Sequence, residues 1–325
     1  MLQHPTSTCS SLSEPNKYEL DDSPPQWNDE NETKISNEII RQPSFRIDHA
    51  VCKSILIAQQ PNVSTFSTDS ILLSSFVPFE ELQKKKSKIR PNQSLLRIVD
   101  LCTGNGIVPM LLLRRLKLQN YNEDLINIKA VEIQDEIISL TRKTIELNSA
   151  EKFVEIVHAD LTRDDFVKDM GEGLFDIVTC NPPYFRPEEG ITNQSICVSI
   201  AKFEIKCSLS DIVKTSARLL RNGGKLVMVH RASRLTDIMV CLREHRLEPR
   251  RMQLVYSRRS KRNVQEKLNG TTALLIEAVK EGDSSDDLHG FLNVLEPIFL
   301  YNGNHYSDDM IDNVLAKFTK KNCED

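Results

Sequence analysis

From about residue 50 onwards, short apolar runs alternate with longer amphipathic stretches. The apolar runs have the length and composition of buried β-strands and predict strands at 96–101, 127–133, 155–160, 174–180, 225–230, 250–257 and 273–279. The amphipathic stretches predict helices at about 106–118, 135–148, 208–220 and 233–246, after a short capped helix at 68–77. Alternating strands and helices build a parallel sheet covered on both faces, and the last two strands, with no clear helix between them, predict a hairpin. The expected fold is therefore α/β, with a doubly wound, mostly parallel seven-stranded sheet and an antiparallel terminal hairpin.

The first fifty residues have a different character. They hold nine acidic and four basic side chains and are rich in Ser, Pro, Asn and Asp, with little periodicity. Such a segment buries too little apolar surface to offset the entropy of ordering it, which predicts a disordered acidic tail over residues 1–45. We expect one α/β domain over 46–310 and a C-terminal polar helix or tail over 311–325.

Composition narrows the class of protein. The 325 residues are 39% hydrophobic with a net charge of −4, which is typical of a soluble globular protein. The absence of an apolar run of about 18 residues, of a signal peptide and of a transit peptide leads us to expect a cytoplasmic protein that binds no membrane. The eight cysteines show no CxxC spacing and the seven histidines are scattered, so we expect reduced thiols and no metal. We expect a monomer or a weak dimer.

Candidate binding chemistry begins where the predicted strand 96–101 ends. There the sequence runs Asp100-Leu-Cys102-Thr103-Gly104-Asn-Gly106, and the glycines let a ligand approach the backbone before a helix begins. The loop lacks the third glycine of a dinucleotide-binding motif, because Pro109 stands in its place, which argues against NAD or FAD.

Acidic residues end the next two predicted strands. Glu132 is placed to accept a ribose diol, and Asp160 is placed to bond an adenine amine. Each acid alone is more often a solvated loop charge. Their recurrence at successive strand ends favours one nucleoside-binding crevice, since ligands of such sheets bind at the carboxyl ends of the strands.

The strand 174–180 runs into Asn181-Pro182-Pro183-Tyr184, where the prolines stop the ladder and stiffen the loop. An amide oxygen and a fixed carbonyl accept hydrogen bonds from an exocyclic amine, and an aromatic ring stacks on the base that carries it. The motif predicts a site for a flipped-out adenine or another planar amide. The alternative is a plain strand terminator with a half-buried loop tyrosine.

Together these motifs resemble the class I S-adenosylmethionine-dependent methyltransferases that modify exocyclic or amide nitrogen, which have a Rossmann-like fold. Phe66 to Leu73 and Val229-His230-Arg231 further resemble the bacterial tRNA(Val) adenine-37 N(6)-methyltransferase family, over about residues 55–305. The resemblance implies S-adenosyl-L-methionine as cofactor and Asn181, Pro182 and Tyr184 as catalytic residues. The implied cofactor-binding residues are Thr68, Asp69, Asp100, Cys102, Thr103, Gly104, Gly106, Glu132, Asp160 and Asn181.

A basic segment suggests contact with nucleic acid. Residues 243–267 hold nine basic and three acidic side chains, on a body that is otherwise close to neutral. We expect phosphate contacts from this segment. The candidate RNA-binding residues are Arg250, Arg251, Arg258, Arg259, Lys261 and Arg262. The alternative is a solvated hairpin whose charges only aid solubility.

The favoured interpretation is methyl transfer to the exocyclic 6-amino group of an adenosine in tRNA. One alternative is a protein glutamine amide N-methyltransferase acting on a release factor or ribosomal protein. Such enzymes usually carry a helical domain of some 70 residues before the first strand, where this chain has a largely polar tail. The other is a noncatalytic cofactor-binding subunit, against which the intact Asn181 and Tyr184 argue.

Overall fold

The protein is described from a computed structural model. It covers residues 45–51, 54–61, 63, 65–80, 95–190, 195–258, 271–280, 291–302 and 305–319. The chain divides into two compact units, Met1–Gln42 and Pro43–Asp325, and all described residues belong to the second. The predicted tail over 1–45 therefore lies almost entirely outside the described residues.

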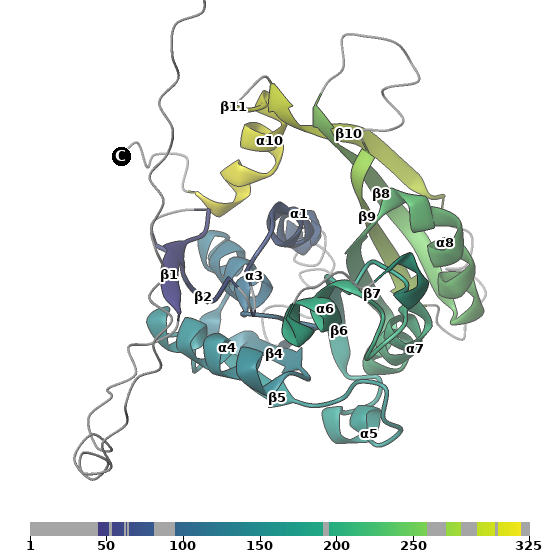
Figure 1. Ribbon diagram of the computed structural model, residues 1–325, viewed down its shortest axis with the longest axis horizontal. Helices are drawn as coiled ribbons and strands as arrows, with labels where there is room; N and C mark the ends of the chain where they lie inside the picture. Colours follow the sequence, from purple (N-terminus) through teal and green to yellow (C-terminus); the bar gives the residue numbers. More distant parts are fainter. Residues whose placement is uncertain are drawn as a thin grey trace, which may run out of the picture. The chain divides into compact units, whose positions relative to one another are not determined.

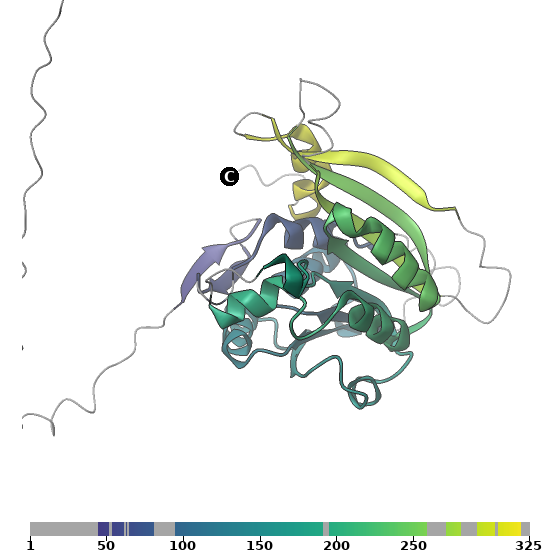
Figure 2. The same ribbon diagram turned by 45° about the vertical axis from the view of Figure 1, so that its right-hand side comes forward.

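Within the described residues, a nine-stranded sheet forms the centre of the fold, in the order β11-β10-β8-β9-β7-β6-β3-β4-β5 (Figures 1 and 2). Its strands are β3 Leu96–Leu101, β4 Ile126–Glu132, β5 Val154–His158, β6 Phe175–Cys180, β7 Leu220–His230, β8 Leu247–Arg258, β9 Thr271–Lys280, β10 Asn293–Asn302 and β11 His305–Tyr306. The block from β5 to β7 is parallel, and β9 is antiparallel to both β7 and β8. The α/β class, the mostly parallel sheet and the hairpin are confirmed.

The prediction of seven strands is wrong by two, because β10 and β11 extend the sheet beyond the hairpin. β10 pairs in parallel with β8, and its register shifts between Leu295 and Ile298. Pro297 lies at this irregularity. A proline has no N–H for the ladder and interrupts the apolar alternation, which hides the strand from pattern analysis.

Helices cover both faces of the sheet. They are α1 Thr68–Phe76, α3 Ile107–Leu118, α4 Asp135–Leu147, α5 Phe166–Met170, α6 Ile196–Lys202, α7 Leu209–Leu219, α8 Leu235–Glu244 and α10 Asp308–Asn313. Short 3-10 turns lie at Glu123–Leu125, Pro187–Glu189, Ala232–Arg234 and Leu315–Phe318, and a separate two-stranded sheet pairs β1 Arg46–His49 with β2 Leu56–Gln59. One hydrophobic cluster includes side chains of α1, α3 and the C-terminal turn, and another includes those of α5, α7 and α8.

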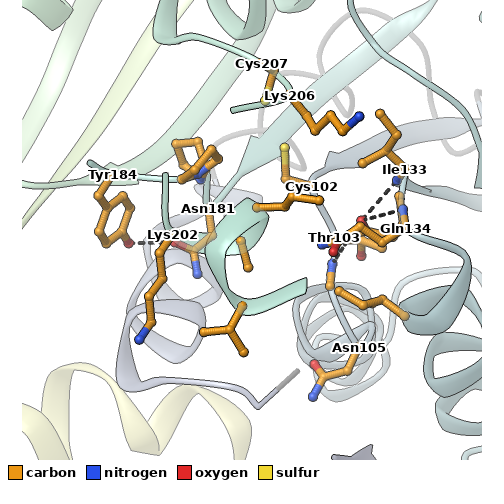
Figure 3. A pocket seen from close by; sticks show the side chains of 18 of the residues that line it. Cys102, Thr103, Asn105, Ile133, Gln134, Asn181, Tyr184, Lys202, Lys206 and Cys207 are labelled. Carbon is orange, nitrogen blue, oxygen red and sulfur yellow. Dashed lines mark hydrogen bonds between the residues drawn. The ribbon is translucent and has the colours of Figure 1, made fainter. Parts of the chain in front are cut away.

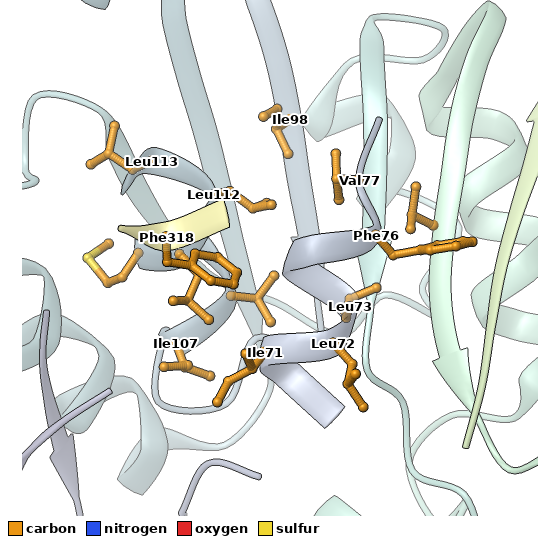
Figure 4. Packing of buried hydrophobic residues seen from close by; sticks show 14 of the residues in the cluster. Ile71, Leu72, Leu73, Phe76, Val77, Ile98, Ile107, Leu112, Leu113 and Phe318 are labelled. Atoms are coloured by element: carbon orange, nitrogen blue, oxygen red, sulfur yellow. The ribbon is translucent and has the colours of Figure 1, made fainter. Parts of the chain in front are cut away.

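Helix α1 is buried on nearly all sides, from Ser70 to Phe76, because it lies between the sheet, α3 and the C-terminal turn. Ile71 and Leu72 pack in the same cluster as Ile107 and Phe318 (Figure 4). The buried guanidinium of Arg115 on α3 donates to the carbonyls of Ser74 and Val77, at 2.6 and 2.8 Å, and so satisfies the C-terminal carbonyls of α1. This contact ties the end of α1 to α3.

The C-terminal turn belongs to the same core. Val314 and Phe318 are fully buried, so the expected boundary at residue 310 does not coincide with a break in packing. Lys317 Nζ also donates to the Ser75 carbonyl of α1 at 2.9 Å. Across the described part of the chain, no helix has the length and apolar character needed to cross a membrane.

Candidate active site

The loop after β3 has an unusual backbone. Cys102, Gly104 and Gly106 have φ values of 57°, 57° and 84°. A Cβ at Gly106 would come within 3.0 Å of Thr141 Cγ2, so glycine is needed there for space as well as for its dihedral angle. The Thr141 hydroxyl donates to the Gly104 carbonyl at 2.6 Å and anchors the loop on α4.

Glu132, the last residue of β4, ties two strand ends together. Its carboxylate accepts backbone N–H groups from Gly104 at 3.0 Å, Ile133 at 3.0 Å and Gln134 at 3.1 Å. Burial raises the pKa of this carboxyl, and the hydrogen bonds lower it again in part. The Glu132 side chain also lines the cavity. A ribose bound in the cavity can therefore reach the carboxylate, as the sequence predicts.

The other two predicted acids differ in position. Asp100 is buried behind the cavity wall and accepts the Thr179 hydroxyl at 2.6 Å; burial raises its pKa to about 7. Asp160 lines the cavity, and its Oδ1 accepts from the Thr162 backbone and hydroxyl at 2.9 and 2.7 Å. Asp160 is therefore the one that a ligand can reach directly.

The Asn-Pro-Pro-Tyr turn at the end of β6 meets the first turn of α1. Asn181 Nδ2 donates to Ser70 Oγ at 3.2 Å, and the Tyr184 hydroxyl lies 2.6 Å from Asn181 Oδ1 and 3.1 Å from Asp69 Oδ2. Figure 3 shows Asn181 and Tyr184 on one side of the pocket and Thr103 and Gln134 on the other. The residues that are candidates for binding the methyl acceptor thus lie across a shared cavity from the loop that is the candidate for binding the cofactor.

The Tyr184 ring packs against a buried histidine. The ring of His230, at the end of β7, lies 5.1 Å from it at an interplanar angle of 41°. His230 is fully buried, its Nδ1 accepts the Arg231 backbone N–H at 2.8 Å, and burial lowers its pKa to about 4, so the ring is neutral at pH 7. The backbone N–H groups of Tyr184 and Phe185 both donate to the Lys202 carbonyl at 3.0 Å and dock the turn on α6.

The cavity formed by these elements has a volume of about 720 Å³, enough for a nucleoside cofactor beside a base. Of the predicted site residues, it is lined by Asp69, Cys102, Thr103, Gly104, Glu132, Asp160, Asn181, Pro182 and Tyr184. Thr68, Asp100 and Gly106 do not line it. Gly106 shapes the loop through its left-handed backbone conformation. Asp100 lies behind the loop and binds the Thr179 hydroxyl.

Several residues that line the cavity were not predicted from the sequence. Asn105, Ile133 and Gln134 adjoin predicted residues, and adjacency was the available signal. Ser70, Lys202, Lys206 and Cys207 also line the cavity, and the last three come from the segment 195–207, which carries no recognisable motif. Its place at the site comes from the pairing of Phe185 with Phe203.

The predicted RNA-binding residues divide into two groups. Arg251 points into the interior, where its guanidinium lies 2.8 Å from Glu277 and 4.1 Å from the Phe76 ring centroid. Its predicted contact with RNA is therefore wrong, because the charge is already paired inside the fold. Arg250 on β8 is half-buried. Arg259, Lys261 and Arg262 lie outside the described residues, as does the side chain of Arg258, so their role stays a prediction.

The residues present fit S-adenosylmethionine. Gly104 lines the cavity without a side chain, and Glu132 presents a carboxylate where a ribose would lie. Asn105 Nδ2 is buried and, among the described residues, has no hydrogen-bond partner, although the residue lines the cavity. A buried amide in that state favours a polar ligand that completes its bonding. No cluster of three or more His, Cys, Asp or Glu suited to a metal ion occurs in the described ranges.

Comparisons with known proteins agree with this geometry. The sheet is that of Rossmann-like methyltransferases: a structure described as a predicted O-methyltransferase from Agrobacterium tumefaciens superposes with a TM-score of 0.52 at 19% identity, covering 77% of this chain and 97% of that one. The chain belongs to the family described as "Methyltransferase small domain", whose sequence profile matches residues 54–245. The family and the fold imply S-adenosyl-L-methionine as cofactor.

Two kinds of relative are similar in sequence. A "tRNA1(Val) (adenine(37)-N6)-methyltransferase" of Tolumonas auensis is 24% identical over 177 residues, covering 54% of this chain and 63% of the relative. A "Release factor glutamine methyltransferase" of Mycolicibacterium smegmatis is 29% identical over 139 residues, covering 41% of this chain and 45% of the relative. The chain thus spans roughly half to two thirds of the length of these relatives.

Proposed function

We propose that this methyltransferase transfers the methyl group to the exocyclic 6-amino group of an adenosine in tRNA. The observation that carries the proposal is the shared cavity, with the Asn181 amide and the Tyr184 ring on one side and the loop 102–105 with Glu132 on the other. An amine held by Asn181 would lie beside a cofactor held by that loop.

The acceptor side of the cavity suits a weak planar nucleophile. An adenine amine is poorly nucleophilic because its lone pair is delocalised into the ring. Hydrogen bonds to Asn181 Oδ1 and the Pro182 carbonyl favour a pyramidal nitrogen with its lone pair aimed at the methyl group, while the Tyr184 ring stacks on the base. Bound S-adenosylmethionine supplies an activated methyl group, so the protein's task is to orient the amine and exclude water.

Two observations support RNA as the carrier of that amine. Among eight relatives that are similar in sequence, six are named as tRNA adenine methyltransferases. The segment 243–267 adds a net charge of +6 to a chain whose total is −4. Its described part comprises the end of α8 and strand β8, which β9 separates from β7 in the sheet, and Arg243 and Arg246 are exposed there. A local basic surface on a near-neutral body favours phosphate contact at one face.

A protein glutamine amide is the second candidate. The same amide, carbonyl and ring can hold a side-chain amide, and release factor glutamine methyltransferases are also among the relatives. In the described residues before β3, the elements are the β1-β2 sheet and α1, with no helical domain.

A comparison of the two candidate substrates tests the proposal. The purified full chain is given radiolabelled S-adenosylmethionine with either total tRNA from a strain lacking the adenine modification or a release factor with its glutamine unmodified. We expect label in tRNA, and N6-methyladenosine after digestion and mass spectrometry, with labelling about 100-fold or more slower for Asn181→Ala. Label in the release factor alone would replace the proposal with the second candidate.

A further inference from the structure

The Tyr184 hydroxyl lies between two acceptors but has one proton to donate. Asn181 Oδ1 is 2.6 Å away and Asp69 Oδ2 is 3.1 Å away. The hydroxyl can therefore make a strong hydrogen bond to only one of them at a time. This choice bears on the reaction, because Asn181 Oδ1 is the oxygen assigned to the substrate amine.

The surrounding contacts keep the three groups in place. Asn181 Nδ2 donates to Ser70 Oγ at 3.2 Å, and Ser70 is 4% exposed, so the amide is turned with its oxygen towards Tyr184. Asp69 precedes Ser70 on α1, whose far end is held by Arg115. The Tyr184 ring packs on His230, which restricts its rotation. The competition for the proton is thus built into a rigid arrangement.

The charges of the two oxygen-bearing groups decide which acceptor is stronger. Burial raises the pKa of Tyr184 well above its ordinary value, so the hydroxyl keeps its proton. Burial also raises the pKa of Asp69, which its hydrogen bond with Tyr184 lowers again in part. When ionised, the Asp69 carboxylate accepts a stronger, charge-assisted hydrogen bond than the neutral amide of Asn181. When protonated, it loses that advantage and the proton turns to Asn181.

We propose that Asp69 is a positioning residue: it accepts the Tyr184 hydroxyl when the substrate amine binds, so that Asn181 Oδ1 can exchange its 2.6 Å bond to the hydroxyl for a bond to the amine. The inference rests on the proposed function, since it assumes an amine held by Asn181. It gives Asp69 a role on the acceptor side of the cavity, in place of the cofactor contact predicted from sequence. Ser70 serves the same end by fixing the rotation of the amide.

The test is a double-mutant cycle between Asp69 and Tyr184. Asp69→Asn replaces the carboxylate with a neutral amide, a weaker acceptor, so the Tyr184 hydroxyl stays on Asn181 Oδ1 and competes there with the substrate amine. We expect single-turnover methyl transfer to fall about tenfold or more in this variant. In the Tyr184→Phe background the competing proton is gone, so the same Asp69→Asn change should alter the rate less than about twofold. The affinity for S-adenosylmethionine, measured by calorimetry, should be the same in all four proteins.

A matched control and separate readouts keep the inference falsifiable. Ser75→Ala removes a buried hydroxyl from the same helix, where it donates to the Leu72 carbonyl, away from the cavity; its rate should follow its stability alone. An equal loss from Asp69→Asn in both backgrounds would overturn the inference, and so would a parallel loss of cofactor affinity. Absence of activity of the wild-type chain on tRNA would instead count against the proposed function.

Discussion

Glu132 accepts the backbone N–H of Gly104 at 3.0 Å, so the acid that ends β4 holds the glycine loop that ends β3. The two residues are 28 positions apart in sequence and adjacent at the carboxyl edge of the sheet. One carboxylate thereby shapes the loop and faces the cavity. The cofactor side of the site depends on this pair.

Replacing Glu132 should weaken cofactor binding without unfolding the protein. Glu132→Ala removes the anchor of Gly104 and the predicted ribose contact, and we expect S-adenosylmethionine affinity to fall by roughly 1–3 kcal/mol. Calorimetric titration measures the effect, with Glu151→Ala, an exposed acid on the turn before β5, as control. Unchanged affinity in a folded Glu132→Ala protein would contradict the assignment.

Asn181 should act mainly on the rate. Asn181→Ala removes an acceptor aligned with the reacting nitrogen, an interaction that matters most in the transition state, so we expect turnover to fall about 100-fold or more. Affinities for tRNA and cofactor should change little. Single-turnover kinetics with saturating tRNA provide the measurement, and a fully active variant would show that the methyl acceptor binds elsewhere.

The basic segment should contribute a salt-dependent part of RNA affinity. Charge reversal of Arg258, Arg259 and Arg262 together should raise the tRNA dissociation constant and reduce the slope of its salt dependence by about two to three units. Charge reversal of three exposed residues on the helices α4, α5 and α7 changes the net charge equally and serves as control. These residues are Arg142, Lys168 and Lys214. An equal effect of both sets would show that net charge alone affects tRNA binding and would contradict a specific phosphate contact by this segment.

Arg115 should stabilise the fold through α1. Its guanidinium is 1% exposed and donates to two carbonyls of α1, and burial lowers its pKa to about 10 without discharging it at pH 7. Arg115→Ala leaves buried carbonyls without a donor, so we expect the free energy of unfolding to fall by about 3–5 kcal/mol. The neighbouring Arg114→Ala, which loses one 3.3 Å bond to the Phe318 carbonyl, should cost less than half as much in urea denaturation.

His230 should make stability fall in mild acid. Its pKa is about 4 in the fold against 6.5 when unfolded, so the unfolded chain binds the proton first as the pH drops. This contribution is fully present above pH 6.5 and is lost as the pH falls towards 4, at about 1.4 kcal/mol per pH unit. Between pH 7.5 and 5.0 the loss amounts to about 2 kcal/mol.

The variant His230→Phe separates this effect from other titrating groups. It loses the Arg231 hydrogen bond, which lowers stability at pH 7.5. On going from pH 7.5 to 5.0, the change in its free energy of unfolding should be more favourable than that of the wild type by about 2 kcal/mol, because the His230 loss is absent. Asp100, whose pKa is raised to about 7, contributes stability as the pH falls and does so equally in both proteins. His49→Gln, at an exposed histidine, should keep the wild-type pH dependence.

Local pattern was sufficient for the elements that build the parallel block of the sheet. The apolar run of 174–180, the glycines at 104 and 106 and the prolines at 182 and 183 each report on a few neighbouring residues, because strand burial, left-handed backbone and a stopped ladder are local properties. The α/β class and the methyltransferase family follow from these signals in combination. The additional strand β10 escaped them, because Pro297 breaks its local pattern.

The acceptor side of the site was decided by tertiary structure. Asn181 meets Ser70 across 111 residues and Tyr184 meets Asp69 across 115, contacts that exist because α1 packs on the sheet under the Arg115 cap. Arg251 is basic and next to Arg250 in sequence, but it turns inward because the register of β8 against β9 sets it opposite the buried carboxylate of Glu277. Such pairings depend on which surfaces meet after folding, and no local sequence pattern encodes them.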